Sequence, residues 1–166
     1  MDIVESLIES IKNKMVGDGC MQVIRVGTHK DVEKVKSFLT KVGISTEGVE
    51  RIIEYFVVIE DIDGGLIATL GIEPLDNIGI LRSMVIHPSI KEEDLFTIFQ
   101  HVYNLASNKK LSTLYLTTNK EKSLPLFRMA GFERIEKTHL PKEFEHSLYG
   151  KHLLSHQQAI FMEKVM

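Results

Sequence analysis

The segment His87–Phe96, HPSIKEEDLF, joins an apolar, strand-like run to the start of a helical pattern. Helix N-termini bind phosphate readily, because their amide groups are unpaired and carry the positive end of the helix dipole. Here, three consecutive acids, Glu92, Glu93 and Asp94, occupy the first turn. Like charges 4 Å apart repel by about 1 kcal/mol in water and about 4 kcal/mol at an effective dielectric near 20. The segment also fits an ordinary helix start, with Ser89 and Glu92 spaced for a capping box.

Three other residue types suggest chemistry by themselves. His152 and His156 are four residues apart, so a helix would place both on one face, but two imidazoles without a third ligand predict no metal site. Cys20 is the single cysteine, which excludes an intramolecular disulfide, and no neighbouring residue would activate it as a nucleophile. Arg82 has the fork geometry that suits a carboxylate, although the position also fits a surface strand residue.

The composition is that of an ordinary globular protein. The chain has 166 residues, of which 43% are hydrophobic and 26% charged, enough for one domain with a sizeable core. A formal net charge of -3 argues against a general nucleic-acid binder. The start, MDIVESLIES, lacks the features of a signal peptide, and the apolar runs are too short to span a bilayer. We therefore expect a cytoplasmic protein, monomeric or homodimeric, without nucleic-acid or membrane partners.

Hydrophobic periodicity predicts the elements that position these residues. An amphipathic helix at 2–15 should form a segment of its own, 1–18, and the rest, 19–166, should be a single α+β domain. Turn signals at IDGG (62–65) and PLDN (74–77) predict an antiparallel meander of three strands. The expected elements after residue 20 are strand 21–26, helix 31–43, short helix 47–53, strands 54–61, 66–73 and 78–86, helix 93–107, strand 111–118, short helix 121–130, strand 131–137, and a tail of helical turns ending in a strand at QAIFMEKV.

This order resembles the GNAT N-acetyltransferase superfamily, and two segments carry the resemblance. LRSMVIHP (81–88) is similar to the family's fourth strand and its exit into the cofactor loop. LYLTTNKEKSLPLFRMAGFERI (114–135) is similar to the fifth strand, the next helix and the Gly-Phe that opens the sixth strand. The likeness covers roughly 21–138 and implies a mixed, mostly antiparallel twisted sheet of six or seven strands flanked by helices. The tail, from Leu140 on, resembles the end of small amino-acid N-acetyltransferases.

The resemblance implies transfer of an acetyl group from acetyl-CoA, as co-substrate, to the amine of a small molecule or amino acid. The pantetheine arm would bond to the backbone of the fourth strand, and the diphosphate would lie on the loop and helix start that follow. The positions that the resemblance assigns to the cofactor are Met84, Val85, Ile86, Lys91, Glu92, Glu93, Asp94, Leu95, Phe96, Asn119 and Phe127. The strand residues are equally expected as sheet core, and Asn119 as a turn residue.

The chain departs from the family pattern at several of these positions. The family's loop reads Gln/Arg-x-x-Gly-x-Gly/Ala; Lys91 keeps the basic position, but Asp94 and Phe96 replace the two small ones. A side chain at either position blocks close approach of backbone to phosphate. Phe127 stands where the family often has a proton-donating tyrosine, and Ile80 stands where it often has a glutamate base.

Glu73 is the nearest replacement for the missing base, and Arg82 is the candidate for binding a substrate carboxylate. Glu73 also fits a solvated acid at the end of a strand, before Pro74. Two interpretations therefore remain open. The intact layout and Lys91 favour an active N-acetyltransferase, whereas the departures favour a GNAT-fold binding or regulatory protein that has lost acetyl transfer.

Overall fold

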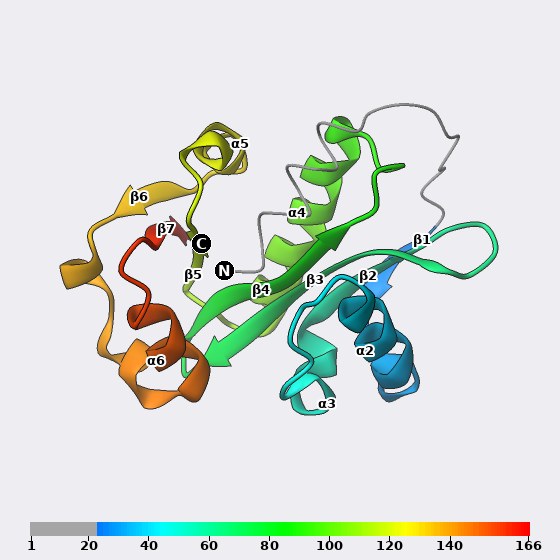
Figure 1. The fold of residues 1–166 in the computed structure, drawn as a ribbon, viewed down its shortest axis with the longest axis horizontal. Coiled ribbons are helices and arrows are strands. Elements are labelled where there is room, and N and C mark those ends of the chain that lie inside the picture. The colour runs from blue at the N-terminus through cyan, green and yellow to red at the C-terminus, as the bar shows by residue number, and fades with distance from the viewer. Residues whose placement is uncertain (1–22) are drawn as a thin grey trace.

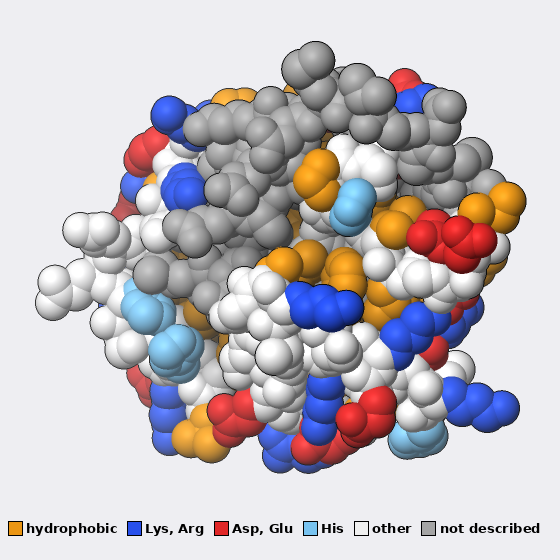
Figure 2. Space-filling model, turned by 45° about the vertical axis from the view of Figure 1, so that its right-hand side comes forward, with side chains coloured by type: hydrophobic (Ala, Val, Ile, Leu, Met, Phe, Trp, Pro, Cys, Tyr) orange, Lys and Arg blue, Asp and Glu red, His pale blue; other side chains and the backbone are white. Residues whose placement is uncertain are grey.

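The computed structural model describes residues 23–166. The helix expected at 2–15, the separate segment 1–18 and Cys20 lie outside the described residues. No helix in the described part is long and apolar enough to cross a membrane. On the face that Figure 2 presents, acidic and basic side chains are interspersed, which fits the small net charge of -3.

The described residues build one mixed sheet in the strand order β1-β2-β3-β4-β5-β7-β6 (Figure 1). Every neighbouring pair is antiparallel except β4 and β5, which are parallel. The expected fold class and the three-strand meander, β2-β3-β4, are both confirmed. The strands are β1 Val23–Val26, β2 Phe56–Glu60, β3 Leu66–Leu75, β4 Ile78–Ile86, β5 Thr113–Thr118, β6 Glu133–Ile135 and β7 Ile160–Val165.

Helices lie on both faces of this sheet (Figure 1). The α-helices are α2 Val32–Lys41, α3 Val49–Ile52, α4 Glu92–Asn108, α5 Leu124–Met129 and α6 Leu148–Leu154. Short 3-10 turns occur at His29–Asp31, Ile53–Tyr55, Glu121–Ser123, Lys137–His139 and Lys142–His146.

Strand alternation decides which helix each face receives. Val57 and Ile59 of β2 belong to the main core together with α4, whereas Phe56 and Val58 pack with α2 and α3 on the opposite face. Both sets of side chains are almost fully buried, so β2 is apolar on both faces. A strand covered on both sides loses the polar–apolar alternation of a one-sided sheet, which explains the continuous apolar run of its sequence.

The C-terminal segment adds a third cluster on the face opposite α4. Phe144 lies edge-on against Tyr115 of β5, with ring centroids 5.3 Å apart, and also against Phe161 of β7. Leu153 of α6 is completely buried in this cluster. The tail therefore packs onto the second half of the sheet, on the same face as α3.

One turn differs from the expectation. β3 continues through Pro74 to Leu75, so the connection to β4 is only Asp76 and Asn77 rather than the whole of PLDN. Proline is tolerated near the end of a strand because only one ladder donor is lost there. Asp76 has φ 53, a left-handed conformation that aspartate accepts more readily than most residues.

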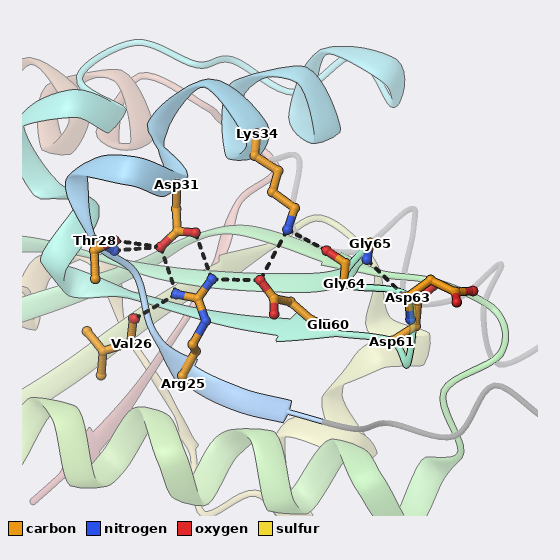
Figure 3. A network of polar contacts seen from close by, with 10 residues as sticks. All are labelled: Arg25, Val26, Thr28, Asp31, Lys34, Glu60, Asp61, Asp63, Gly64 and Gly65. Carbon is orange, nitrogen blue, oxygen red and sulfur yellow. Dashed lines mark hydrogen bonds and ion pairs between the residues drawn. The ribbon is translucent and has the colours of Figure 1, made fainter.

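An ion-pair network joins β1, the turn before α2, and β2 (Figure 3). Arg25 donates to both carboxylate oxygens of Asp31 at 2.7 Å and to Glu60 at 2.6 Å. Asp31 also accepts from the amide of Thr28 at 2.7 Å. Lys34 adds a second cation, 3.1 Å from Glu60. The network ties the edge strand β1 to the start of α2.

These contacts change the acidity of both carboxyl groups. The hydrogen bond from Arg25 holds the pKa of Asp31 well below its ordinary value, despite the opposing effect of burial. The same guanidinium also lowers the pKa of Glu60. Because the folded pKa of Asp31 lies below the unfolded one, the network stabilises the fold fully above the unfolded pKa, about 3.9. This stabilisation is lost as the pH falls through the folded pKa.

Asp31→Asn should therefore lower the free energy of unfolding at pH 7 by about 2 kcal/mol. This is less than the 3–5 kcal/mol typical of a broken buried pair, since Arg25 is one-third exposed. The deficit should shrink as the pH is lowered from 4 towards 2, measured by urea unfolding monitored by circular dichroism. The exposed Glu33 of the same helix offers the control E33Q, expected within about 0.5 kcal/mol of wild type. Equal effects of the two substitutions at pH 7 would contradict the assignment.

Candidate functional site

β4 and β5 separate after a short stretch of parallel pairing. Ile78–Ile80 of β4 pair with Thr113–Tyr115 of β5, and pairing between these two strands stops there. β4 itself continues to Ile86, still paired with β3, and β5 continues to Thr118, still paired with β7. The two strands therefore open a V-shaped gap in the sheet.

A β-bulge lies on β4 directly beyond the point of separation. Thr69 pairs with Val85 and Gly71 pairs with Arg82, so that three steps on β4 oppose two on β3. Ser83 takes up the extra residue with φ 55, a strained conformation for a residue other than glycine. Its carbonyl accepts a buried hydrogen bond from Thr69 Oγ1 at 2.8 Å. Bulges re-aim side chains, and here Arg82 and Ser83, though adjacent, both line the same cavity.

That cavity has a volume of about 780 Å³ and lies on the face that carries α2, α3 and α6. This is within the usual size range of small-molecule sites. It is lined by residues from the α2–α3 connection and α3, the end of β3, the bulge of β4 and the start of α6. The lining residues are Ile44, Ser45, Glu47, Arg51, Ile52, Glu73, Pro74, Arg82, Ser83, Ser147, Leu148, Tyr149 and His152.

Arg82 contacts residues from several walls of this cavity. Its Nη1 donates to Glu73 Oε2 at 2.7 Å, its Nη2 to the carbonyl of Glu47 at 2.9 Å, and its Nε to Ser83 Oγ at 3.2 Å. The ring of Tyr149 on α6 covers the guanidinium, with 5.1 Å between its centroid and Cζ. Arg82 is only 6% exposed. These contacts compensate for the hydration that the guanidinium loses on burial.

Two buried hydroxyl groups lie near the carboxyl end of β5 without hydrogen-bond partners. Thr117 Oγ1 is on β5, two residues beyond its last pair with β4, and Ser123 Oγ is at the start of α5. Buried polar atoms are normally paired, so these two are sites where a bound molecule would supply the missing partner. A pantetheine arm, with its amide and carbonyl groups, is one such molecule.

Comparison with known proteins places the chain in a family. No family model matches the sequence. The uncharacterised protein YwlB of Bacillus subtilis (strain 168) is 30% identical over 142 residues, which cover 85% of this chain and 95% of that protein. The chain belongs to the family of YwlB.

Solved structures identify the fold as that of the GNAT acetyltransferases. Rv2747 from Mycobacterium tuberculosis, solved in complex with CoA, superposes with a TM-score of 0.68 at 17% identity, over 87% of this chain and 99% of that one. N-acetylglutamate synthase from Neisseria gonorrhoeae, solved with CoA and N-acetyl-glutamate, gives 0.67 at 18% identity, over 86% of this chain but 34% of that one. A GNAT acetyltransferase from Staphylococcus aureus Mu50 gives 0.65 at 17% identity, over 86% and 98%.

Within the GNAT fold, the segment expected to bind a diphosphate forms the start of α4. Glu92 and Glu93 are exposed and Asp94 is half-buried, so the first two carboxylates lie in solvent, where their charge is screened. Lys91 is also exposed and occupies the N-cap position. Leu95 is buried in the main core.

The capping box expected for this helix is absent. Lys91 rather than Ser89 is the N-cap, and α4 has no side-chain cap. Ser89 Oγ lies instead 2.8 Å from Nδ1 of His87, which also accepts from the amide of Ser89 at 3.1 Å. Ser89 therefore bonds back to His87 in the loop instead of capping α4.

The other expected cofactor positions differ in their access to solvent. Met84, Val85 and Ile86 have buried side chains on the part of β4 that has left β5, so their backbone is the part relevant to a ligand. Asn119 is exposed in the bend after β5. Phe127 is completely buried and lies edge-on to Phe99 in the main core, with 6.4 Å between centroids.

The structure brings Glu73 and Arg82 together in one ion pair, whereas sequence reasoning treated them as two independent candidates. Among the cavity residues that sequence reasoning missed are Ser83, Ser147 and Tyr149. Ser147 caps α6 by accepting from the amide of Gly150 at 2.8 Å. The serine three residues before that glycine is a sequence signal for a helix start. It gives no indication that Ser147 lines a cavity.

Arg82→Met should lower the free energy of unfolding by about 3 kcal/mol, because it leaves the largely buried Glu73 without its cation. Arg51→Met is the matched control, since Arg51 lines the same cavity but is exposed; we expect a change within about 0.5 kcal/mol. The double variant E73M/R82M should recover part of the loss. Additive effects of E73M and R82M in chemical denaturation would show that the ion pair does not couple the two residues.

Proposed function

We propose that this protein transfers an acetyl group from acetyl-CoA to the amine of a small molecule or amino acid. The observation that carries the proposal is the position of the cavity: it opens at the bulge of β4, directly beyond the point where β4 leaves β5. A donor held in the gap and an acceptor held in the cavity would thus meet at one point of the sheet. Support also comes from GNAT-fold neighbours solved with CoA.

The residues that would hold the donor are of two kinds. The backbone of Met84, Val85 and Ile86 borders the gap, and the unpaired hydroxyls of Thr117 and Ser123 lie near its opposite strand. The diphosphate would rest on the amides at the start of α4, with Lys91 beside it. When bound, acetyl-CoA supplies the thioester carbonyl that the amine attacks.

Glu73 is the carboxylate that we assign to the proton released by the amine. Arg82 binds its Oε2, and Oε1 has no partner among the described residues, so Oε1 remains to accept a proton directly or through water. The ion pair fixes the orientation of this carboxylate. Three of the five N–H groups of Arg82 are used by Glu73, Glu47 and Ser83, which leaves one on each Nη for an acceptor's carboxylate.

A second candidate function follows from the start of α4. The acids at 92–94 and the absence of glycine from 87–96 favour a GNAT-fold binding or regulatory protein without acetyl transfer. Glu92 and Glu93 face solvent, and exposed charges interact weakly with a ligand across water. These two acids are therefore a weak argument against binding of a diphosphate. We therefore keep the enzyme as the main proposal.

Titration calorimetry with acetyl-CoA and a thiol-release assay over a panel of amines and amino acids test the proposal together. We expect binding, and turnover with at least one acceptor. For that acceptor, E73Q should lower kcat by about 10²-fold or more with little change in KM, as for loss of a general base. Glu50, an exposed carboxylate on α3 outside the cavity, offers the control E50Q, which should retain wild-type kinetics.

Each negative result has a different meaning. No heat of binding and no rise in melting temperature at millimolar acetyl-CoA would reject the enzyme, because a bound ligand must stabilise the fold by mass action. Binding without turnover on any acceptor would favour the regulatory protein. Turnover that E73Q leaves unchanged would keep the enzyme and reject Glu73 as its base.

The three acids of α4 allow a separate prediction about charge. Replacing them together, E92Q/E93Q/D94N, should tighten acetyl-CoA binding by a few-fold at low salt, because repulsion of the diphosphate is removed. The gain should disappear at high salt, where the charges are screened. A triple variant with wild-type affinity at every salt concentration would mean that these carboxylates act only on the helix itself.

A further inference from the structure

Two histidines meet at the C-terminal end of α6. His152 is on the helix, and His156 follows its last turn. Their Nε2 atoms are 3.2 Å apart, and their rings are nearly perpendicular, at 87° with centroids separated by 4.6 Å. The nitrogens that an imidazole uses to bind metals are thus directed into one small volume.

The separation of these nitrogens matches that of two ligands on one metal ion. Zinc–imidazole bonds of 2.0–2.1 Å at a tetrahedral angle place the two nitrogens about 3.3 Å apart. A hydrogen bond between the rings gives a similar distance, so the observed separation of the two nitrogens is compatible with either arrangement.

The backbone that carries the pair is held in several ways. Ser155, between the two histidines, donates its hydroxyl to the carbonyl of His152 at 2.6 Å and its amide to that of Lys151 at 3.1 Å. The amide of His156 donates to the carbonyl of Leu153 at 3.3 Å, and Leu153 is completely buried. The spacing of the two imidazoles is therefore supported by the core.

The pair lies at the rim of the cavity, because His152 is one of its lining residues. His152 is exposed and His156 half-buried, so both can be reached from solvent. Within 23–166, no cluster of three or more His, Cys, Asp or Glu side chains could hold a metal. A cation bound here would therefore keep open positions for water or for a carboxylate ligand in the cavity.

We propose that His152 and His156 form a two-histidine site for a borderline divalent cation, such as Zn²⁺, Ni²⁺ or Cu²⁺, at the rim of the cavity. Imidazole pairs select these ions, whereas Mg²⁺ and Ca²⁺ require oxygen ligands. The site is independent of acetyl transfer and can be tested whether or not the protein is an enzyme.

The test is titration calorimetry of the full chain with ZnCl₂ at pH 7.5, repeated with NiCl₂ and with MgCl₂. We expect one Zn²⁺ per chain, comparable Ni²⁺ binding and no Mg²⁺ binding. H152Q and H156Q should each weaken Zn²⁺ binding at least tenfold. His101, an exposed histidine on α4, gives the control H101Q, which should bind as wild type does. Circular dichroism of each variant checks that the fold is retained.

Two outcomes would overturn the proposal. Absence of Zn²⁺ binding at millimolar concentration would mean that the two imidazoles only hydrogen-bond to each other. Zn²⁺ binding that neither H152Q nor H156Q weakens would place the metal elsewhere in the chain. A loss confined to these two variants, with H101Q unaffected, supports the site.

Discussion

The separation of β4 from β5 is the constraint on which the rest of the site depends. Parallel pairing holds the two strands together for only three residues, while each remains paired on its outer side, β4 with β3 and β5 with β7. The sheet can therefore open in its middle without losing the ladders on either flank. On either face of the sheet a helical layer remains in place, with α4 on one side and α2 and α3 on the other.

Arg82 links the elements that line the cavity next to this opening. It is a buried cation at a bulge, and its partners come from the end of β3, the α2–α3 connection and α6. A buried charge is tolerated only where its hydrogen bonds are satisfied, so the same contacts that make Arg82 acceptable also fix the walls relative to one another. The left-handed Ser83 beside it is the local strain that accompanies this arrangement.

Charge distribution separates the two ends of the proposed site. At the start of α4, the acids lie mostly in solvent, where their fields are weakened, and the helix amides remain the main feature presented to a ligand. In the cavity, Glu73 and Arg82 are largely removed from water, so their mutual attraction is strong and geometrically defined. A charge-removing substitution in the cavity should accordingly change the free energy of unfolding more than one at the start of α4.

Local periodicity and turn chemistry were sufficient to predict the order and type of the elements and the three-strand meander, because both signals depend on residues close together in the chain. The spacing of Ser89 and Glu92 was misleading, since His87, not the helix, takes the serine hydroxyl. The packing of separate elements, by contrast, brings Glu73 and Arg82 into one ion pair and places the ring of Tyr149 over the guanidinium. These contacts join residues of separate elements, and the packing of the sheet and α6 sets their distances, whereas the pairing of His152 with His156 follows from the local spacing of four residues.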